Sequence, residues 1–391
     1  MLNTPMSPWP SYTKEEAAAV KRVLLSNRVN YWTGTECRDF EQEFAVATGS
    51  AHAVALANGS LALELALKAL DIGDGDEVIV TPRSFIASAS SVVNLGATPI
   101  FADIDSDSQN LTAATIAPHV GPKTRAIIVV HLAGWPCEMD EIMELARERN
   151  LYVIEDCAQA HGARYRGKSV GAIGDIGCWS FCQDKIISTG GEGGMVTTDD
   201  ESLWHKMWSY KDHGKTWHNV YRNHHPSGFR WLHESFGSNW RLTEMQAAIG
   251  RIQLKRLDNW SEKRRSNSGN IEKVCLEFES LRVPMVPDYS LHARYKYYCF
   301  VNNEQLKARW SRDRIVEEMM AQGVPCYQGI CPEIYLEKAF QHHPSRPIQR
   351  LPVARALGET SLMFLVHPTL TEEEIGRCCE MISNVMIDAS R

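Results

Sequence analysis

Long apolar runs are missing from this chain of 391 residues. No segment approaches the ~18 consecutive apolar residues that a membrane-spanning helix needs. The opening, MLNTPMSPWPSYTKEE, contains neither the basic segment nor the apolar block of a secretory signal. We therefore expect a protein that stays in the cytoplasm and has no membrane partner.

CxxC pairs and strongly basic clusters are missing too. The 11 cysteines are scattered along the chain, and Cys178, Cys182 and Cys299 stand beside hydrophobic residues, which is typical of reduced thiols in a core. We expect no metal site. The net charge is −7, and EKRR at 262–265 is most simply a solvated helix face, so the composition argues against a nucleic-acid partner.

The sequence also lacks repeats and low-complexity linkers, and what it contains instead is alternation. Helix-like and strand-like segments follow one another at 60–70 (helix), 75–82, 96–105 and 124–134 (strands), 139–150 (helix) and 151–159 (strand). This order predicts a mostly parallel sheet that is covered on both faces. A long amphipathic helix over 241–274 follows. Because the chain exceeds the roughly 250–300 residues of one core, we expect a large domain, 1–260, and a small domain, 261–391.

Ligands of open α/β sheets bind beyond the carboxyl ends of the strands, and three polar segments stand at such places. In the first, Asn58, Gly59 and Ser60 stand where a helix begins. Free backbone N–H groups and the helix dipole can hold an anion such as phosphate at this point. Equally, Ser60 could simply cap the helix.

The second segment, VIEDCAQAHG, places Asp156 at the end of a buried strand, with Gln159 three residues on. A carboxylate there is poorly solvated and needs hydrogen bonds or a cationic partner, which a protonated ring nitrogen would supply. A helix-capping or turn-forming aspartate is at least as frequent in such places. Alternation points Glu155 to the opposite face of the sheet.

The third segment, SFCQDKIISTGGEGG at 180–194, places Lys185 between an apolar stretch and a loop rich in glycine. Desolvation disfavours the ammonium form and frees a neutral amine that can attack a carbonyl. The alternative is an exposed lysine at a strand end, which is the commoner situation for this residue type. We expect the backbone to pass close to a bound group at the glycines, which are Gly190, Gly191, Gly193 and Gly194.

These three segments follow the order found in aminotransferases that share the aspartate aminotransferase fold and bind pyridoxal 5′-phosphate. More narrowly, the chain resembles the DegT/StrS type of sugar aminotransferases, which act on nucleotide-linked keto sugars. The motifs that carry the resemblance run through nearly the whole chain, and they are YWTGTECRDFEQEFA, NGSLAL, DEVIVTP, GATPIFADID, EDCAQAHGARYRGKSVGAIGDIGCWSF, GGEGGMVTTDD, SNWRLTEMQAAIGRIQLKRLD and HPTLTEEEI.

The resemblance implies a fold and a reaction. The fold would be the α/β fold of type I PLP-dependent transferases, with a mostly parallel seven-stranded sheet flanked by helices and a smaller C-terminal α+β domain. The enzyme would move an amino group from an amino acid, foremost L-glutamate, to a nucleotide-linked keto sugar in surface-polysaccharide or amino-sugar biosynthesis.

The resemblance also implies roles for single residues. Lys185 would form the Schiff base with the cofactor aldehyde and carry the proton, and Asp156 would keep the ring nitrogen protonated. Gln159 would bond the ring hydroxyl, and Phe85 would stack on the ring. The phosphate ligands would be Gly59, Ser60 and Ser180, joined by Asn239 of the neighbouring subunit, so the active unit would be a homodimer with shared sites.

Some positions depart from the family pattern. Gln183 and Asp184 precede the lysine where relatives often carry histidine or another small polar residue, so we assign them no catalytic part. Trp240 stands where tyrosine or serine is frequent. NWRLTE at 239–244 looks more like the motif of enzymes that aminate C4 than the NSRLD of those that aminate C3, which favours a UDP- or dTDP-linked 4-keto-6-deoxy sugar. C3 amination of a 3-keto sugar stays open.

Two activities from other classes also stay open. A relative that dehydrates its sugar replaces the lysine, usually with histidine, so Lys185 argues against this activity. A relative that binds the cofactor only for a regulatory role is the other alternative, and the complete set of Lys185, Asp156 and Gln159 argues against it.

Overall fold

The largest sheet of the protein contains seven strands in the order β1-β9-β8-β5-β4-β2-β3. The structure is a computed structural model that describes residues 6–221, 224–225 and 227–391. In sheet order the strands are His52–Leu56, Gly194–Thr198, Ile176–Ser180, Tyr152–Asp156, Thr124–Val130, Glu77–Val80 and Thr98–Phe101. Only β9 runs antiparallel to the other six strands. The predicted mostly parallel sheet is confirmed.

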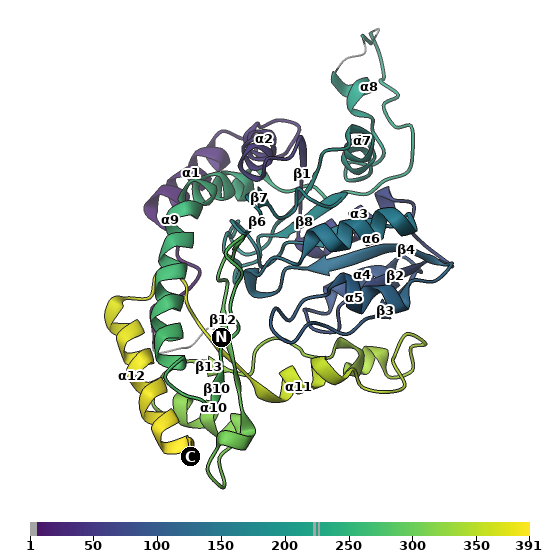
Figure 1. Ribbon diagram of the computed structural model, residues 1–391. Coiled ribbons are helices and arrows are strands. Elements are labelled where there is room, and N and C mark those ends of the chain that lie inside the picture. Colours follow the sequence, from purple (N-terminus) through teal and green to yellow (C-terminus); the bar gives the residue numbers. More distant parts are fainter. Residues whose placement is uncertain (1–5, 222–223, 226) are drawn as a thin grey trace.

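Helices cover both faces of this sheet (Figure 1). Val78 and Val80 belong to one apolar cluster, whereas Ile79 between them belongs to another. Successive side chains of a strand point to opposite faces, so β2 is buried on both sides. The first cluster includes residues of α2 (Glu36–Thr48), α3 (Gly59–Ala69), α4 (Ala87–Asn94) and α7 (Glu201–Tyr210), and the second includes residues of α5 (Ala113–Ile116) and α6 (Met139–Arg149).

The long helix predicted over 241–274 is α9, Glu244–Cys275. Its N-cap is Thr243, whose side chain accepts a hydrogen bond from Gln246 N–H while the Gln246 side chain bonds back to Thr243. This capping box starts the helix after Asn239. Asn239 is therefore not the N-cap of this helix.

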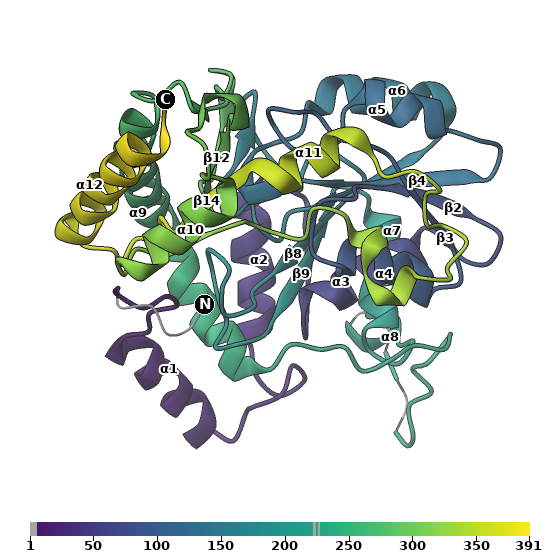
Figure 2. The ribbon, with the colours of Figure 1, turned by 90° about the horizontal axis from the view of Figure 1, so that it is seen from below.

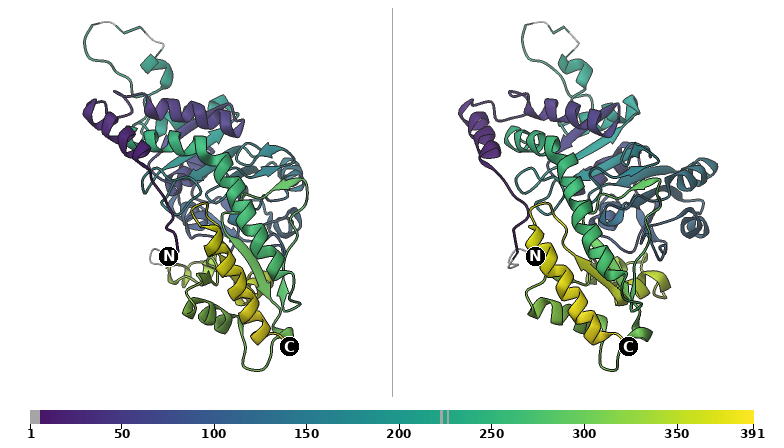
Figure 3. Two further views of the ribbon diagram at one scale, coloured as in Figure 1. Left: turned by 90° about the vertical axis from the view of Figure 1, so that its left-hand side faces the viewer. Right: turned by 60° about the vertical axis from the view of Figure 1, so that its left-hand side comes forward.

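The last turns of α9 pack into a second core with a four-stranded antiparallel sheet. Figure 3 shows α9 running beside α12 at this end of the molecule. The elements here are β10 (Leu281–Arg282), β12 (Tyr297–Val301), β14 (Ser361–Phe364), β13 (Cys326–Tyr327), α10 (Arg312–Ala321) and α12 (Glu372–Ala389). Residue 260 lies inside α9, and the division into domains at that residue stays a proposal.

The remaining elements lie around these two parts. Figure 2 shows α11 between the smaller sheet and the β2–β3 side of the larger one. They are α1 (Lys14–Leu25), α8 (Trp217–Tyr221), α11 (Pro352–Thr360), a small sheet of β11 (Ser290–Leu291), β6 (Arg164–Tyr165) and β7 (Lys168–Ser169), and the 3₁₀ helices 117–119, 132–134, 303–305, 334–336 and 338–340.

The structure also bears on the expectations about cysteines and membrane-spanning helices. All 11 cysteines are free thiols, but Cys182 is only half-buried, so the prediction that it lies in the core is wrong. The reason is that it follows the end of β8 and faces a cavity. Within the described ranges, the structure has no helix that is both long and apolar enough to cross a membrane.

Candidate active site

A cavity of about 570 Å³ lies where β5 and β8 end. Every residue predicted for the cofactor site except Asn239 lines it, and these residues are Gly59, Ser60, Phe85, Asp156, Gln159, Ser180 and Lys185. They come from four separate segments of the chain, which the parallel strands bring to one edge of the sheet. A larger cavity of about 640 Å³, between α2 and α9, has no lysine in its lining and offers no amine.

The start of α3 forms an anion cradle at one end of the cavity. Asn58 is the N-cap, and its side chain accepts a hydrogen bond from Leu61 N–H at 2.9 Å. Ser60 therefore lies in the first turn and is not the cap. A Cβ on Gly59 would stand 2.6 Å from the Cβ of Ser180, so only glycine lets the helix start approach the end of β8 this closely. N–H groups of the first turn and the Ser180 hydroxyl meet here.

Asp156 stands at the end of β5 with only 6% of its surface exposed. Its carboxylate accepts hydrogen bonds from the Ser88 hydroxyl at 2.8 Å and from Ala158 N–H at 3.1 Å. Burial raises the pKa of Asp156, although these two bonds and the charge of Lys185 act in the opposite direction. A buried carboxylate with a raised pKa gains most from a cationic hydrogen-bond donor in the cavity.

Gln159 and Phe85 stand at other walls of the cavity. The Gln159 Oε1 accepts a hydrogen bond from Ala133 N–H at 2.8 Å, which fixes the amide so that its NH₂ group is the end left to donate. Phe85 is 62% exposed, a high value for a phenylalanine. An exposed ring at a cavity wall can stack against a bound planar group.

The segment with Lys185 leaves β8 at Ser180 and returns to β9 at Gly194. The Lys185 side chain is only 16% exposed, so it is not the exposed strand end that was the alternative. Its Nζ lies 3.4 Å from the Asp184 carboxylate. The expectation of an amine set among apolar groups is therefore incomplete, because the structure gives this amine an acidic neighbour.

The glycines of this loop serve the backbone itself. A Cβ on Gly194 would stand 2.3 Å from the Asn58 carbonyl oxygen, and one on Gly193 would stand 2.1 Å from Thr189 Oγ1. Gly190 and Gly191 have φ values of 90° and 127°, which other residues rarely adopt. None of these glycines lines the cavity. Gly194 lets the loop close tightly against the start of α3, and the expected contact of these glycines with a bound group stays a prediction.

Asn239 lies away from this cavity, in the turn before α9. Its backbone pairs with Asp212, and its side chain is exposed. The phosphate contact that the resemblance implies for Asn239 could only come from a second copy of the chain, and it stays a prediction.

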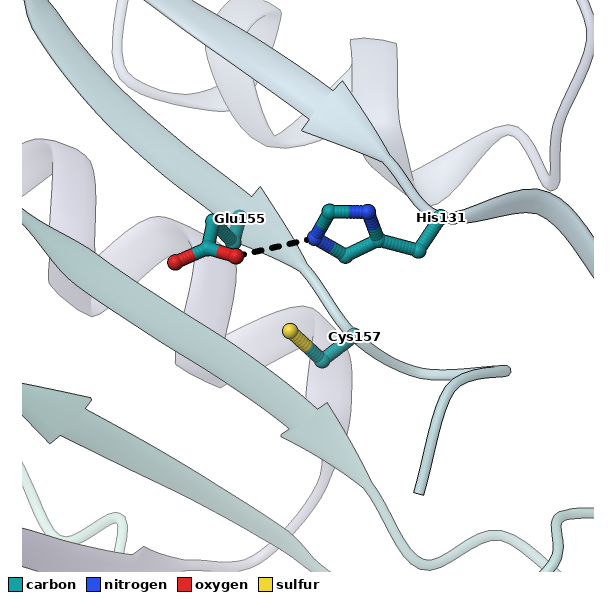
Figure 4. A group of neighbouring side chains, drawn as sticks. All are labelled: His131, Glu155 and Cys157. Carbon is teal, nitrogen blue, oxygen red and sulfur yellow. Dashed lines mark hydrogen bonds and ion pairs between the residues drawn. The ribbon is translucent and has the colours of Figure 1, made fainter. Parts of the chain in front are cut away.

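Glu155 points to the opposite face of the sheet from Asp156, as alternation predicts, and lies beside His131 and Cys157 (Figure 4). In the described part of the chain this is the one group of side chains arranged as a metal could use them. The polar atoms of Glu155 and His131 are already engaged. Glu155 accepts hydrogen bonds from His131 Nε2 at 2.9 Å and from three backbone N–H groups, those of Gly171, Ile173 and Gly174. These bonds tie β5 to the following loop.

Sequence reasoning missed two groups that act on the predicted site. Ser88 stands one helical turn after Phe85, and this spacing could have placed its hydroxyl near the same strand end as Asp156. Asp184 was set aside because it departs from the family pattern, but it is in direct contact with Lys185. Its position next to the lysine was the available signal.

The residues of the cavity fit pyridoxal 5′-phosphate. The cradle at α3 suits the phosphate, and the buried Asp156 suits a protonated ring nitrogen. The Lys185 amine lines the same cavity and can reach an aldehyde in it.

Comparison with known proteins gives the same answer over nearly the whole chain. Residues 10–383 match the DegT/DnrJ/EryC1/StrS aminotransferase family. GDP-perosamine synthase of Escherichia coli O157:H7 is 34% identical over 379 residues, which is 97% of this chain and 98% of that protein. UDP-N-acetyl-3-dehydro-alpha-D-glucosamine 3-aminotransferase of Acidithiobacillus ferrooxidans is 37% identical over 353 residues, which is 90% of this chain and 89% of that protein. The crystal structure of an aminotransferase from Psychrobacter cryohalolentis has a TM-score of 0.97 and 60% identity, and covers 98% of this chain and 99% of that one.

Proposed function

The chain belongs to the DegT/DnrJ/EryC1/StrS aminotransferase family, and on this premise we propose a substrate pair for it. The enzyme is a nucleotide-sugar aminotransferase with pyridoxal 5′-phosphate as its cofactor. We propose that it takes the amino group from L-glutamate and transfers it to C4 of a UDP- or dTDP-linked 4-keto-6-deoxy sugar, for surface-polysaccharide or amino-sugar biosynthesis.

One observation supports the chemistry above all others. The amine of Lys185, the buried carboxylate of Asp156 and the anion cradle at Gly59 and Ser60 line a single cavity. When bound, the cofactor supplies an aldehyde that accepts amino groups and a ring that takes up electrons.

The side chains would divide the work as follows. Lys185 would hold and move a proton at Nζ, and Asp156 would hold a proton on the ring nitrogen through its own negative charge. Gln159 would donate from its amide to orient the ring, and Phe85 would cover one ring face. Ser180 and the α3 backbone would bind the phosphate and exclude water from that end.

The position of amination rests on NWRLTE at 239–244, which favours C4. The Acidithiobacillus relative is named for amination at position 3, so C3 is the competing proposal. The test is incubation with glutamate and a panel of UDP- and dTDP-linked 3-keto and 4-keto sugars, with mass detection of the amino sugar and NMR assignment of the carbon. We expect product from a 4-keto sugar, and product from 3-keto sugars alone would contradict C4 amination.

We also propose that the active unit is a homodimer. Support comes from residues 227–237, which expose Phe229, Trp231 and Phe236 by 78%, 84% and 100%. Monomeric proteins rarely expose large apolar side chains so fully in one segment. Asn239 follows this segment, so Asn239 and the exposed aromatic side chains would face the same second copy of the chain.

Complementation tests the shared site. Chains with Lys185→Ala and chains with Asn239→Asp, in which the new carboxylate repels phosphate, should each be inactive. A heterodimer of the two carries both defects in one site and neither in the other, so refolded equimolar mixtures should regain about a quarter of the wild-type activity. Mixtures that stay inactive although mass spectrometry detects heterodimers would contradict a site built from two chains.

A further inference from the structure

We propose that Asp184 is the positioning residue of Lys185, and that Tyr295 holds Asp184 in place for this task. The proposal rests on the proposed role of Lys185 and adds a second acid to the site. Neither Asp184 nor Tyr295 would touch the substrate. Both would act through the lysine amine during the period in which it is free of the cofactor.

The geometry of the three groups forms one chain of contacts. The Tyr295 hydroxyl donates a hydrogen bond to Asp184 Oδ2 at 2.5 Å. The other oxygen of Asp184 lies 3.4 Å from Lys185 Nζ. Neighbouring residues of an extended strand point to opposite sides, but Lys185 N–H bonds back to the Cys182 carbonyl at 3.0 Å. This turn brings the two side chains to the same side of the loop.

Tyr295 is well placed to fix the carboxylate. It is buried, with 6% of its surface exposed, and comes from the segment before β12, far from Asp184 in the sequence. Two amines lie near its ring, with Lys185 Nζ at 5.5 Å and Lys296 Nζ at 4.8 Å from the ring centre. A buried ring holds its hydroxyl in a fixed place, and this hydroxyl bonds to Asp184.

The charges around the lysine explain why an acid is needed. Lys296 and Arg264 are buried close by. Burial first, and then the charge of Arg264, lower the pKa of Lys296 to about 7. Burial also lowers the pKa of Arg264 to about 9. Lys296 and Lys185 repel each other electrostatically, and in the described part of the chain Asp184 is the only carboxylate that bonds directly to the Lys185 amine.

The other titratable groups near this amine do not replace Asp184. Asp156 interacts with Lys185 electrostatically but is bonded to Ser88 and Ala158. His161 is neutral, because burial and the charge of Lys185 lower its pKa to about 3. Burial would raise the pKa of Asp184, but the charge of Lys185 and the bond from Tyr295 outweigh it and lower the pKa. Asp184 is therefore ionised at neutral pH and offsets the nearby cations.

These contacts define a role for Asp184. After the amino donor displaces Lys185, the amine must hold a proton and stay at the cavity. The Asp184 carboxylate stabilises the ammonium form and keeps Nζ within reach of the reacting carbon. Without Asp184 the amine would lose its one directly bonded carboxylate among the described residues, and its position would be unrestrained.

The test measures the lysine itself in the cofactor-free enzyme. Acetic anhydride acetylates neutral amines, and peptide mass spectrometry gives the rate at Lys185 at pH 7. In Asp184→Asn this rate should rise by about tenfold or more, because the amine is then released from the carboxylate that engages it at 3.4 Å. Tyr295→Phe should give a smaller rise, and Asp184→Glu should restore a rate close to the wild type.

Asp71→Asn is the matched control. It removes an acid from an Asp–Lys pair at the surface, 2.7 Å from Lys206, and should leave labelling of Lys185 unchanged. An unchanged rate in folded Asp184→Asn would overturn the proposal, and so would an equal rise in the control. If Asp184→Asn did not fold, Tyr295→Phe would decide the question, and an unchanged labelling rate at Lys185 in that variant would overturn the proposal. Because the assay contains neither sugar nor cofactor, its result is independent of whether the proposed substrates react.

Discussion

Lys185→Ala is expected to abolish turnover, with a loss of at least about 10⁴-fold, because alanine can neither bond the cofactor aldehyde nor carry a proton. The visible absorption of cofactor joined to the lysine should disappear as well. Some cofactor should still bind, since the cradle at α3 and the Asp156 carboxylate remain. Stopped assays of amino-sugar formation and absorption spectra of the purified variant measure both effects.

A control and a rescue separate this result from misfolding. Lys206→Ala removes a surface lysine that pairs with Asp71, and it should retain both the absorption band and turnover. A small primary amine added to Lys185→Ala should recover part of the activity, because alanine leaves space at an otherwise intact cavity. If the alanine variant kept the band and near wild-type turnover, another amine would have to perform this chemistry.

The sheet and most of the cavity could be predicted from the sequence because their signals are local. Alternating strands and helices define a sheet covered on both faces, and the residues at the strand ends then meet at one edge. Asp156 and Lys185 follow from this rule together with the family motifs. The start of α9 was predictable too, since Thr243 and Gln246 form the capping pattern S/T-x-x-E/Q.

Other features depend on contacts that sequence patterns do not contain. The bond from Tyr295 to Asp184 joins residues 111 positions apart. The glycines of the Lys185 loop were predicted to approach a bound group. Gly194 has a different reason to be glycine, because a side chain there would collide with the backbone carbonyl of Asn58. The smaller sheet includes strands of two residues, β10 and β13, which are too short for any periodicity to predict.

The other large effect is expected for Asp156→Asn. An amide has no charge with which to hold a proton on the ring nitrogen, so the ring loses its capacity to take up electrons. Turnover should fall by about a thousandfold or more, which corresponds to about 4 kcal/mol in the barrier, whereas a loss below about tenfold, or 1.4 kcal/mol, would show that another residue does this work. Steady-state kinetics should place the loss in kcat, with little change in the KM for the donor.

Stability gives this prediction a second readout whose sign is fixed by the pKa of Asp156. Burial raises that pKa in the folded, cofactor-free protein, so the folded state binds the proton more tightly than the unfolded state. Stability then falls as pH rises from the unfolded pKa through the folded one, and at neutral pH the ionised carboxylate costs stability.

Asp156→Asn should therefore unfold at the same temperature as the wild type or higher without cofactor. Its unfolding temperature should also rise less than that of the wild type when cofactor is added. Asp175→Asn, at a half-buried acid that also has a raised pKa but lies outside the cavity, should keep the full gain. An equal gain from cofactor in Asp156→Asn and the wild type would mean that Asp156 does not hold the ring.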